Sequence, residues 1–235
     1  MWLSLKVNDS TRIALVNRQV ISPPWGNLES ELKITTTTLL DQTVETASSR
    51  STSLIYKIRS FKTQLETKGD IHPPKDWFSP PDISSHSFRI TLTPTGALTT
   101  LGKKENIPEA ALSRLTSLGE NLRSFWVIPP SNAGVGTQWS GIASPCTLNL
   151  SKTGRSTVTC NYRMVAQTEQ SAQIEGIFTV AIENSKERKN TARGSLSVSL
   201  GREKGITKAT RISHLGLRRT KVSPSQRSEL LLQRF

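Results

Sequence analysis

Apolar and polar residues alternate in several runs along the first part of the chain. Residues 12–16 and 53–61 carry apolar side chains at alternating positions, such as Ile13 and Leu15 or Leu54, Tyr56 and Ile58, as in a half-buried strand. Residues 34–38 read Ile-Thr-Thr-Thr-Thr, a β-branched stretch that suits a strand with one face in water. The pattern predicts two or three antiparallel strands within residues 1–69, joined by wide connections.

A proline-rich stretch follows these strands. Residues 70–85 contain four prolines, which lack a backbone donor and restrict the preceding residue, so we predict a loop or linker. Alternation resumes at residues 87–92 and meets a turn signal at Pro94-Thr95-Gly96, which predicts a hairpin inside a main β region that spans residues 86–217.

The hydrophobic period then changes from two to that of a helix. Four apolar residues recur on one helical face: Ala111, Leu115, Leu118 and Leu122. Asn106 followed three residues later by Glu109 resembles a capping box, and Pro108 suits a first turn. We predict one amphipathic helix over residues 107–122.

The last strands are predicted at residues 146–150, 156–160, 173–181, 194–200 and 205–214. The alternating patterns, long Ser/Thr stretches and an apolar fraction of 34% favour one mainly β domain. The predicted fold is a curved antiparallel sheet, open or half-barrel, with the helix packed on it.

The two cysteines of the chain fall in the first two of these predicted strands. A three-residue loop, Lys152-Thr153-Gly154, makes Cys146 and Cys160 direct cross-strand neighbours, at Cα separations of about 4.5 Å that permit a disulfide. Such a bond indicates an oxidising compartment. The alternative is two small hydrophobic residues on the core face. A zinc site is disfavoured because two thiols do not complete a tetrahedral site.

Most of the net charge of +13 lies near the C-terminus, where residues 186–235 hold thirteen Lys or Arg and three Glu. We predict a basic tail over residues 218–235. It is either a solvated tail or part of a surface for anions such as nucleic acid. The candidate anion-binding residues are Arg188, Lys189, Arg218, Arg219 and Lys221.

Two segments after the predicted helix carry a family resemblance. Residues 124–130 read Ser-Phe-Trp-Val-Ile-Pro-Pro, and residues 135–139 read Val-Gly-Thr-Gln-Trp. This pattern of aromatic-x-x-Pro followed by Val-Gly-x-x-Trp resembles a bacterial family of exported or lipid-anchored proteins, domain of unknown function 6263. The motif positions are Pro129, Val135, Gly136 and Trp139. Thr137 departs from the acidic residue that is usual there, and the resemblance covers the C-terminal half.

The motif is also explained without catalysis. Pro129 can end an edge segment, Gly136 permits a tight turn, and Trp139 can close the end of the core at the next strand. We therefore interpret it as a structural corner.

No catalytic, cofactor-binding or metal-binding pattern is found in the sequence. The three histidines are isolated, and neither a Gly-x-Ser-x-Gly motif nor a P-loop occurs. No run of 18 apolar residues predicts a transmembrane helix. The first residues lack the features of a signal peptide, which alone predicts a cytosolic protein, yet the chain opens on a predicted strand, as it would after loss of a leader.

These observations lead to two functional hypotheses. The first is a non-enzymatic protein of the bacterial cell envelope or periplasm that binds or scaffolds an apolar or polymeric ligand. It rests on the resemblance, on the strands with one solvent-exposed face and on the paired cysteines. The alternative is a binder of nucleic acid or anionic surfaces that uses the basic C-terminal region.

Overall fold

The computed structural model describes residues 3–22, 30–69, 82–84, 86–94, 96–101, 107–141, 155–184, 188–216 and 225–235. They form eleven strands and one helix. These are β1 (Ser10–Ile21), β2 (Glu31–Ala47), β3 (Thr52–Lys68), β4 (Ser87–Thr93), β5 (Gly96–Leu101), α1 (Glu109–Arg123), β6 (Gln138–Gly141), β7 (Arg155–Gln167), β8 (Ser171–Asn184), β9 (Arg188–Gly201), β10 (Gly205–Gly216) and β11 (Ser225–Arg234).

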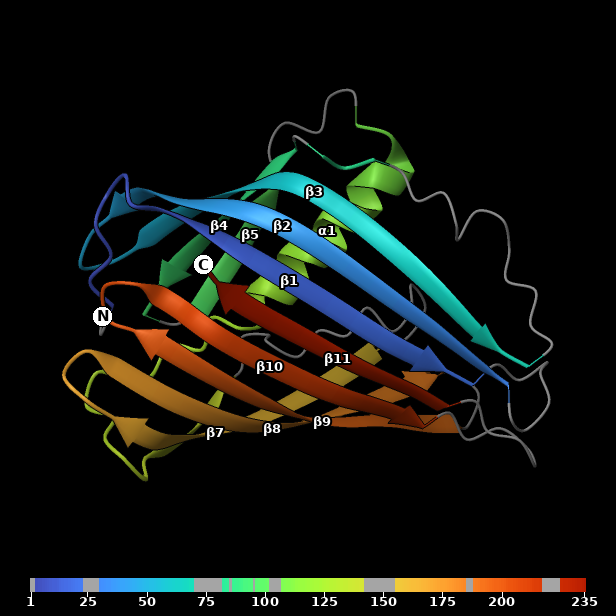
Figure 1. The fold of residues 1–235 in the computed structure, drawn as a ribbon. Coiled ribbons are helices and arrows are strands. Elements are labelled where there is room, and N and C mark those ends of the chain that lie inside the picture. Colours follow the sequence, from blue (N-terminus) through green and yellow to red (C-terminus); the bar gives the residue numbers. More distant parts are fainter. Residues whose placement is uncertain are drawn as a thin grey trace.

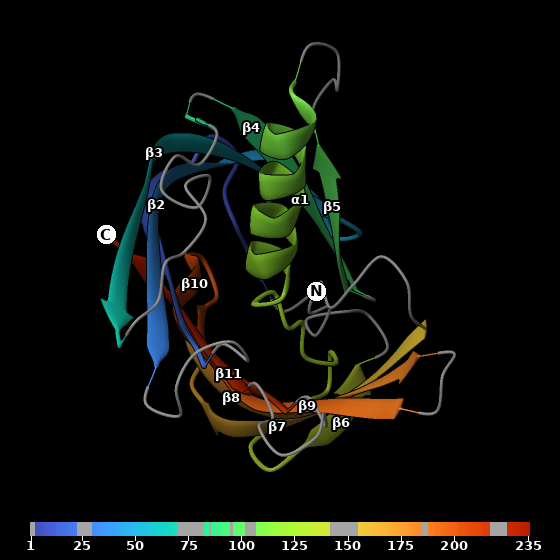
Figure 2. The same ribbon diagram turned by 90° about the vertical axis from the view of Figure 1, so that its right-hand side faces the viewer.

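The strands form a single antiparallel sheet in the order β5-β4-β3-β2-β1-β11-β10-β9-β8-β7-β6. The sheet curls into a half-barrel that does not close, and its edge strands are β5 and β6 (Figure 1). Figure 2 looks along the curl and shows α1 inside it. The predicted fold class, a curved antiparallel sheet with one helix, is confirmed.

The prediction of a basic tail over residues 218–235 is wrong for its second half, because residues 225–234 form β11 at the centre of the sheet. β11 pairs with β1 on one side and with β10 on the other, so it joins the first strands to the last ones. Leu230 and Leu232 are each 1% exposed, and burial of this alternating pair stabilises the strand despite the basic residues around it.

The proline-rich stretch does not separate two sheets. β3 and β4, which flank it in the sequence, pair directly from Thr52 opposite Leu92 to Lys57 opposite Ser87. Residues 70–81 themselves lie outside the described part of the chain. The predicted hairpin is confirmed, since β4 and β5 pair and Thr93 lies opposite Gly96.

The predicted helix is confirmed over residues 109–123, and the four residues assigned to its apolar face are all buried. That face packs on β4 and β5, where Gly119 lies so close to the sheet that a Cβ there would be 2.6 Å from the Thr99 methyl group. The predicted capping box, with Asn106 at the N-cap and Glu109 three residues later, is wrong because Pro108 occupies the N-cap position, and among the described residues no side chain makes the cap hydrogen bond. Asn106 is outside the described residues.

The segment after α1 runs from the end of the helix to β6 (Figure 2), and its Phe125, Trp126 and Val127 are buried. Its Trp126 is 3% exposed and donates from Nε1 to the hydroxyl of Tyr56 at 3.0 Å, and this hydroxyl donates to Gln42 Oε1 at 2.9 Å. The Tyr56 ring stacks on Phe88 with centroids 5.3 Å apart. This buried polar chain ties the segment to β2 and β3.

Candidate ligand-binding cavity

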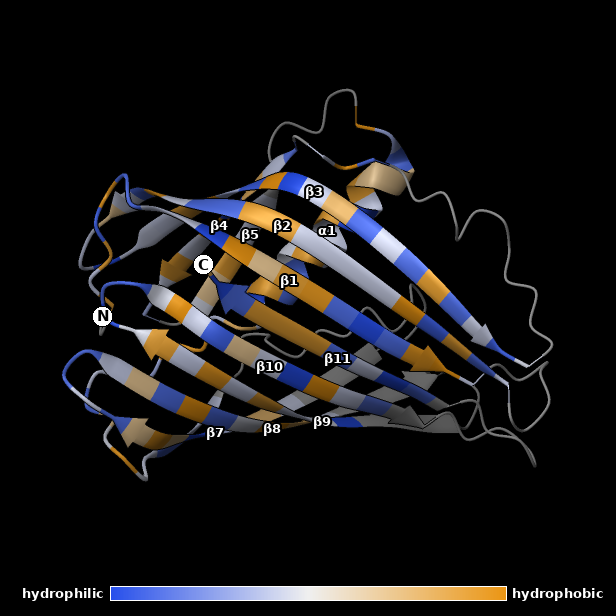
Figure 3. Cartoon of the chain, viewed as in Figure 1, coloured by the Kyte–Doolittle hydropathy of each residue, from blue (hydrophilic) through white to orange (hydrophobic). Residues whose placement is uncertain are grey.

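Alternation along the strands separates two chemically different faces, visible as bands of hydropathy in Figure 3. On β1, for example, the buried Ile13 and Leu15 face inward, while Arg12 and Arg18 face outward. Among the inward positions of the strands whose side chains the structure describes, none is Asp, Glu or Lys, and Arg occurs only at 211 and 234. The inside of the half-barrel is therefore almost free of charge.

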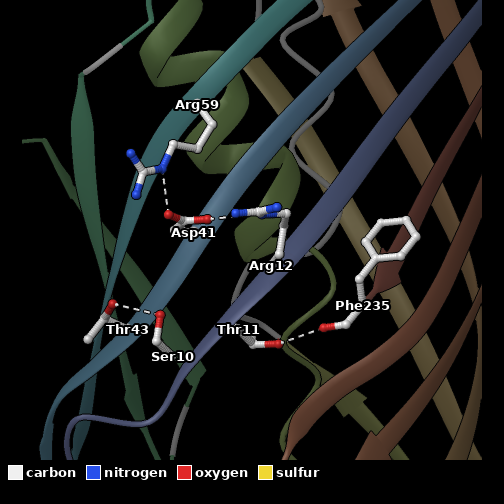
Figure 4. Close-up of polar contacts among 7 residues, drawn as sticks. All are labelled: Ser10, Thr11, Arg12, Asp41, Thr43, Arg59 and Phe235. Atoms are coloured by element: carbon white, nitrogen blue, oxygen red, sulfur yellow. Dashed lines mark hydrogen bonds and ion pairs between the residues drawn. The ribbon is translucent and has the colours of Figure 1, made fainter.

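The charges of the first strands lie on the convex face. Asp41 on β2 accepts from Arg59 Nε on β3 at 2.5 Å and from Arg12 Nε on β1 at 3.5 Å (Figure 4). The hydrogen bond from Arg59, reinforced by Arg12, lowers the pKa of the Asp41 carboxyl below its ordinary value. The ion pairs thus link three neighbouring strands on the outer face and leave the inner face apolar.

A cavity of about 140 Å³ lies between the inner face of the sheet and α1. Its wall of strand residues comprises Leu15, Asn17, Thr36, Thr38, Phe61 and Leu230. Its helical wall comprises Arg114, Ser117, Leu118 and Asn121. The volume is close to that of a cavity that takes one benzene-sized molecule, so it can hold one end of a larger ligand.

The pairing register of β1, β2 and β3 brings the residues of this strand wall next to one another. Thr38 lies opposite both Leu15 and Phe61, and in the next inward row Thr36 lies opposite Asn17. These rows mix aliphatic, aromatic, hydroxyl and amide groups, which suits a molecule that is largely apolar and uncharged along most of its length.

The inner face of β1, β2 and β3 continues beyond this cavity. Along it Ile21, Ile34 and Leu65 point inward, and Ile34 pairs with Leu65 across the strands. They and Phe61 are only partly buried, unlike the fully buried inward residues nearer the start of β3. The structure therefore presents an uncharged inner surface on which these apolar side chains, interspersed with polar ones such as Gln19 and Thr63, are not completely covered by the described residues.

Arg114 and Arg211 bring cationic side chains to the contact between α1 and the inner face of the sheet. Arg114 of α1 lies over the Phe61 ring at 5.3 Å from its centroid, and partial burial lowers the pKa of its guanidinium. Arg211 of β10 donates from Nη2 to Asn121 Oδ1 and from Nη1 to Ser124 Oγ, each at 2.7 Å. Burial lowers the pKa of Arg211 to about 10, so it stays charged at neutral pH.

On β7, β8 and β9, aromatic rings lie flat on glycines of the neighbouring strand. A Cβ added at Gly176 would be 2.7 Å from the Tyr162 ring, and one added at Gly194 would be 2.2 Å from the Phe178 ring. Each glycine is the direct cross-strand partner of its aromatic residue. The two glycines let large rings lie along the sheet instead of standing up into the interior.

The structure places the motif residues at a corner between α1 and β6. Pro129 is buried, Val135 is 65% exposed, and Gly136 has a φ of +89°, a conformation that favours glycine. The Gly136 amide donates to the Met164 carbonyl at 2.8 Å, which fixes the turn against β7. Trp139 at the start of β6 packs at a tilt on Tyr162, with ring centroids 5.7 Å apart.

Cys160 lies on β7 and is buried. Its direct cross-strand neighbours are Gly141 on β6 and Phe178 on β8, so the predicted register with Cys146 directly opposite is wrong. The segment that contains Cys146 lies outside the described residues. Cys160 is not a free thiol in the structure, and a bond to Cys146 stays a prediction.

The candidate anion-binding residues are only partly within the described chain. Arg188 and Lys189 begin β9, whereas Arg218, Arg219 and Lys221 lie outside the described residues. The pairing of Thr191 with Gly216 puts the start of β9 and the end of β10 at the same end of the sheet. Arg211, part of the same basic region in sequence, is inside the half-barrel and 6% exposed, so it is not part of a surface patch.

A larger depression of about 870 Å³ lies at the other end of the sheet, between the β7–β8 and β9–β10 turns. Turn residues such as Thr168, Gln170, Arg202 and Lys204 line it, and most of its wall is polar.

Within the described residues, no group of three or more His, Cys, Asp or Glu side chains could hold a metal ion. In the same part of the chain, no helix has the length and apolar character needed to cross a membrane.

No protein-family model and no curated protein sequence matches this chain. Among solved structures, a structure of lipovitellin that describes lipid–protein interactions matches with a TM-score of 0.60 and 10% identity. The match covers 99% of this chain and 25% of the lipovitellin chain, so the chain spans about a quarter of that protein. An outer-membrane channel from Pseudomonas putida F1 matches over 100% of this chain and 98% of the channel, with 9% identity. Its TM-score of 0.26 is too low to indicate a shared fold. The likeness to lipovitellin is one of fold.

The residues that line the cavity form no recognisable pattern in the sequence. Thr36 stands in a run of four threonines with no visible difference between inward and outward positions. Arg114 is three residues after Ala111 and four before Leu118, so it borders the apolar face of the helix. This spacing was the available signal that its side chain lies near the contact between the helix and the sheet.

Proposed function

We propose that this protein is a non-enzymatic binding protein that holds an apolar ligand inside its half-barrel. One observation carries the proposal: beyond α1 the inner face of β1, β2 and β3 keeps Ile21, Ile34 and Leu65 only partly buried among uncharged polar residues, next to a cavity of about 140 Å³. Leaving such a surface in contact with water is unfavourable by roughly 25 cal/mol per Å² of apolar area, and a ligand that covers it recovers this energy.

Two further observations support the proposal. Charged side chains of β1, β2 and β3 lie on the convex face, so an apolar ligand inside meets no buried acid or lysine of the described strands. The fold is shared with part of lipovitellin, in a structure that describes its lipid–protein interactions. At 10% identity this likeness concerns the fold, and the ligand class is argued from the inner face.

The bacterial cell envelope is the proposed location. It rests on the resemblance of the segment around Pro129 and Trp139 to an exported or lipid-anchored family, and on the predicted bond between Cys146 and Cys160. Alkylation of the native protein before and after reduction checks the redox part. We expect label only after reduction, whereas label without reduction would contradict an oxidising compartment.

The binding proposal is tested with the methyl ester of parinaric acid, a neutral probe that fluoresces when it enters an apolar site. Thr36 faces the cavity and Thr37, the next residue, faces outward. In Thr36→Phe the ring fills the cavity, so we expect probe binding to fall at least tenfold. Thr37→Phe adds the same ring to the convex face and should bind the probe as the unchanged protein does.

The two variants separate ligand exclusion from misfolding. Far-ultraviolet circular dichroism checks that both retain the sheet. If the unchanged protein shows no saturable binding, or if both variants bind as it does, the interior is not an apolar ligand site.

A further inference from the structure

We infer that the ligand is an amphiphile with a single anionic head group, held by Arg114, and a hydrocarbon chain laid along the inner face of β2 and β3. This inference rests on the proposed binding function and specifies the chemical class of the ligand. The shared chemistry is a carboxylate or phosphate on a long hydrocarbon chain.

Arg114 is the charged residue of the cavity wall, and no Asp or Glu lines that wall within the described chain. Among the described residues Arg114 forms no ion pair, and its guanidinium rests on the Phe61 ring instead. A partly buried cation without a counter-ion is unfavourable, and an anionic ligand group both neutralises it and accepts its hydrogen bonds.

The second interior cation differs from Arg114. Arg211 is 6% exposed and already donates to Asn121 and Ser124, so its charge is held in place by the end of α1. It adds positive potential behind Asn121, which lines the cavity. Arg114 is half-buried and lies over Phe61, so it is the cation that a ligand can reach.

The hydrocarbon chain has a continuous path from Arg114. Phe61 is followed on the inward side of β3 by Thr63 and then Leu65, and Leu65 lies opposite Ile34. The step from Phe61 to Leu65 is four residues of strand, about 13 Å. The cavity of about 140 Å³ thus takes the head and the first carbons, and the partly buried Ile34 and Leu65 take the chain.

The test compares parinaric acid with its methyl ester, which have the same chain and differ in charge at the head. We expect the unchanged protein to bind the acid about tenfold to hundredfold more tightly than the ester, the range of a charge-assisted hydrogen bond in a partly buried site. Arg114→Gln should lose this preference and keep the affinity for the ester. Arg114→Lys should keep most of the preference because the charge remains.

Arg18→Gln provides the matched control, since Arg18 points to the convex face from β1 and pairs with the exposed Glu229. It should bind both probes as the unchanged protein does. Equal binding of acid and ester by the unchanged protein would overturn the anionic head while leaving the proposed apolar site intact. Failure to bind either probe would overturn both, and an Arg114→Gln variant that still prefers the acid would exclude Arg114 as its partner.

Discussion

The two tyrosines of the chain should respond in opposite ways to removal of their hydroxyl groups. Tyr56 is 1% exposed, and its hydroxyl both accepts from Trp126 Nε1 and donates to Gln42 Oε1. Tyr162 is 4% exposed, and its hydroxyl has no hydrogen-bond partner among the described residues. Both rings pack against another aromatic ring, so each Tyr→Phe change removes one oxygen and little else.

Tyr56→Phe leaves the Trp126 donor and the Gln42 acceptor without the group that pairs them. Each buried group left unpaired costs about 1–3 kcal/mol, so the two groups together should lower the free energy of unfolding by about 2–6 kcal/mol. For a protein of this size 1 kcal/mol corresponds to about 2–4 °C, so Tm should fall by at least about 4 °C. Tyr162→Phe removes a buried hydroxyl that makes no hydrogen bond to the described residues. We therefore expect the free energy of unfolding to stay the same or to rise by up to about 1 kcal/mol.

Urea unfolding followed by far-ultraviolet circular dichroism measures both variants against the unchanged protein. The difference in midpoint at a constant slope gives the change in the free energy of unfolding. Two results would refute the stabilising role of the buried hydrogen bonds that join Trp126, Tyr56 and Gln42. One is an equal effect of the two changes, and the other is a fall of less than about 0.5 kcal/mol in the free energy of unfolding for Tyr56→Phe.

Three further predictions concern other parts of the fold. Gly194→Ala places a methyl group 2.2 Å from a carbonyl and from an aromatic ring, so we expect at least about 1–3 kcal/mol of destabilisation in a urea titration, whereas Gly134→Ala, with open space around it, should be close to neutral. Leu232→Ala on β11 should lower the free energy of unfolding by about 2–5 kcal/mol, and Leu231→Ala, at a less buried position, should lower it clearly less. Thermal unfolding measures both variants. Equal small losses would contradict the central place of this strand. The lowered pKa of Asp41 means that its ion pairs stabilise the protein above the unfolded-state pKa and are lost as pH falls through the lower folded value. Asp41→Asn should therefore lose up to about 1 kcal/mol at pH 7, and this loss should shrink as the pH falls below the unfolded-state pKa; a loss that does not change with pH would contradict the electrostatic origin.

The parts of the fold that depend on local pattern could be predicted from the sequence. The helix follows from the spacing of Ala111, Leu115 and Leu118. The first half of β3 follows from the alternation of Leu54, Tyr56 and Ile58, whereas the register shift after Ile58 that turns Phe61 inward could not be predicted. In both cases the buried face can be identified within one element, because the period alone identifies it.

The parts that depend on distant pairing could not be predicted in this way. β11 pairs with β1 across more than two hundred residues, from Ile21 opposite Gln226 to Ile13 opposite Arg234, and its Leu230 and Leu232 follow a basic segment that suggested a solvated tail. Arg211 also belonged to that basic region, and only the position of α1, with Asn121 beside β10, explains why it is buried. Local charge was therefore a poor guide to exposure.

The cavity depends on such distant pairing as well. Asn17, Thr36 and Leu230 come from three strands, and α1 adds Arg114 from a fourth part of the chain. Their proximity is a consequence of strand register and of where the helix rests on the sheet. Neither can be read from composition or from a short motif.

The most direct test of the central claim is photo-crosslinking with a diazirine-bearing hydrocarbon probe, followed by residue-level mass spectrometry of the labelled peptides. An apolar ligand inside the half-barrel predicts saturable labelling at inward positions of β2 and β3, such as Thr36, Phe61 and Leu65, with the outward Thr37 and Lys62 unlabelled. Labelling confined to outward positions, or labelling that does not saturate and is not displaced by excess unlabelled parinaric acid or its methyl ester, would contradict it.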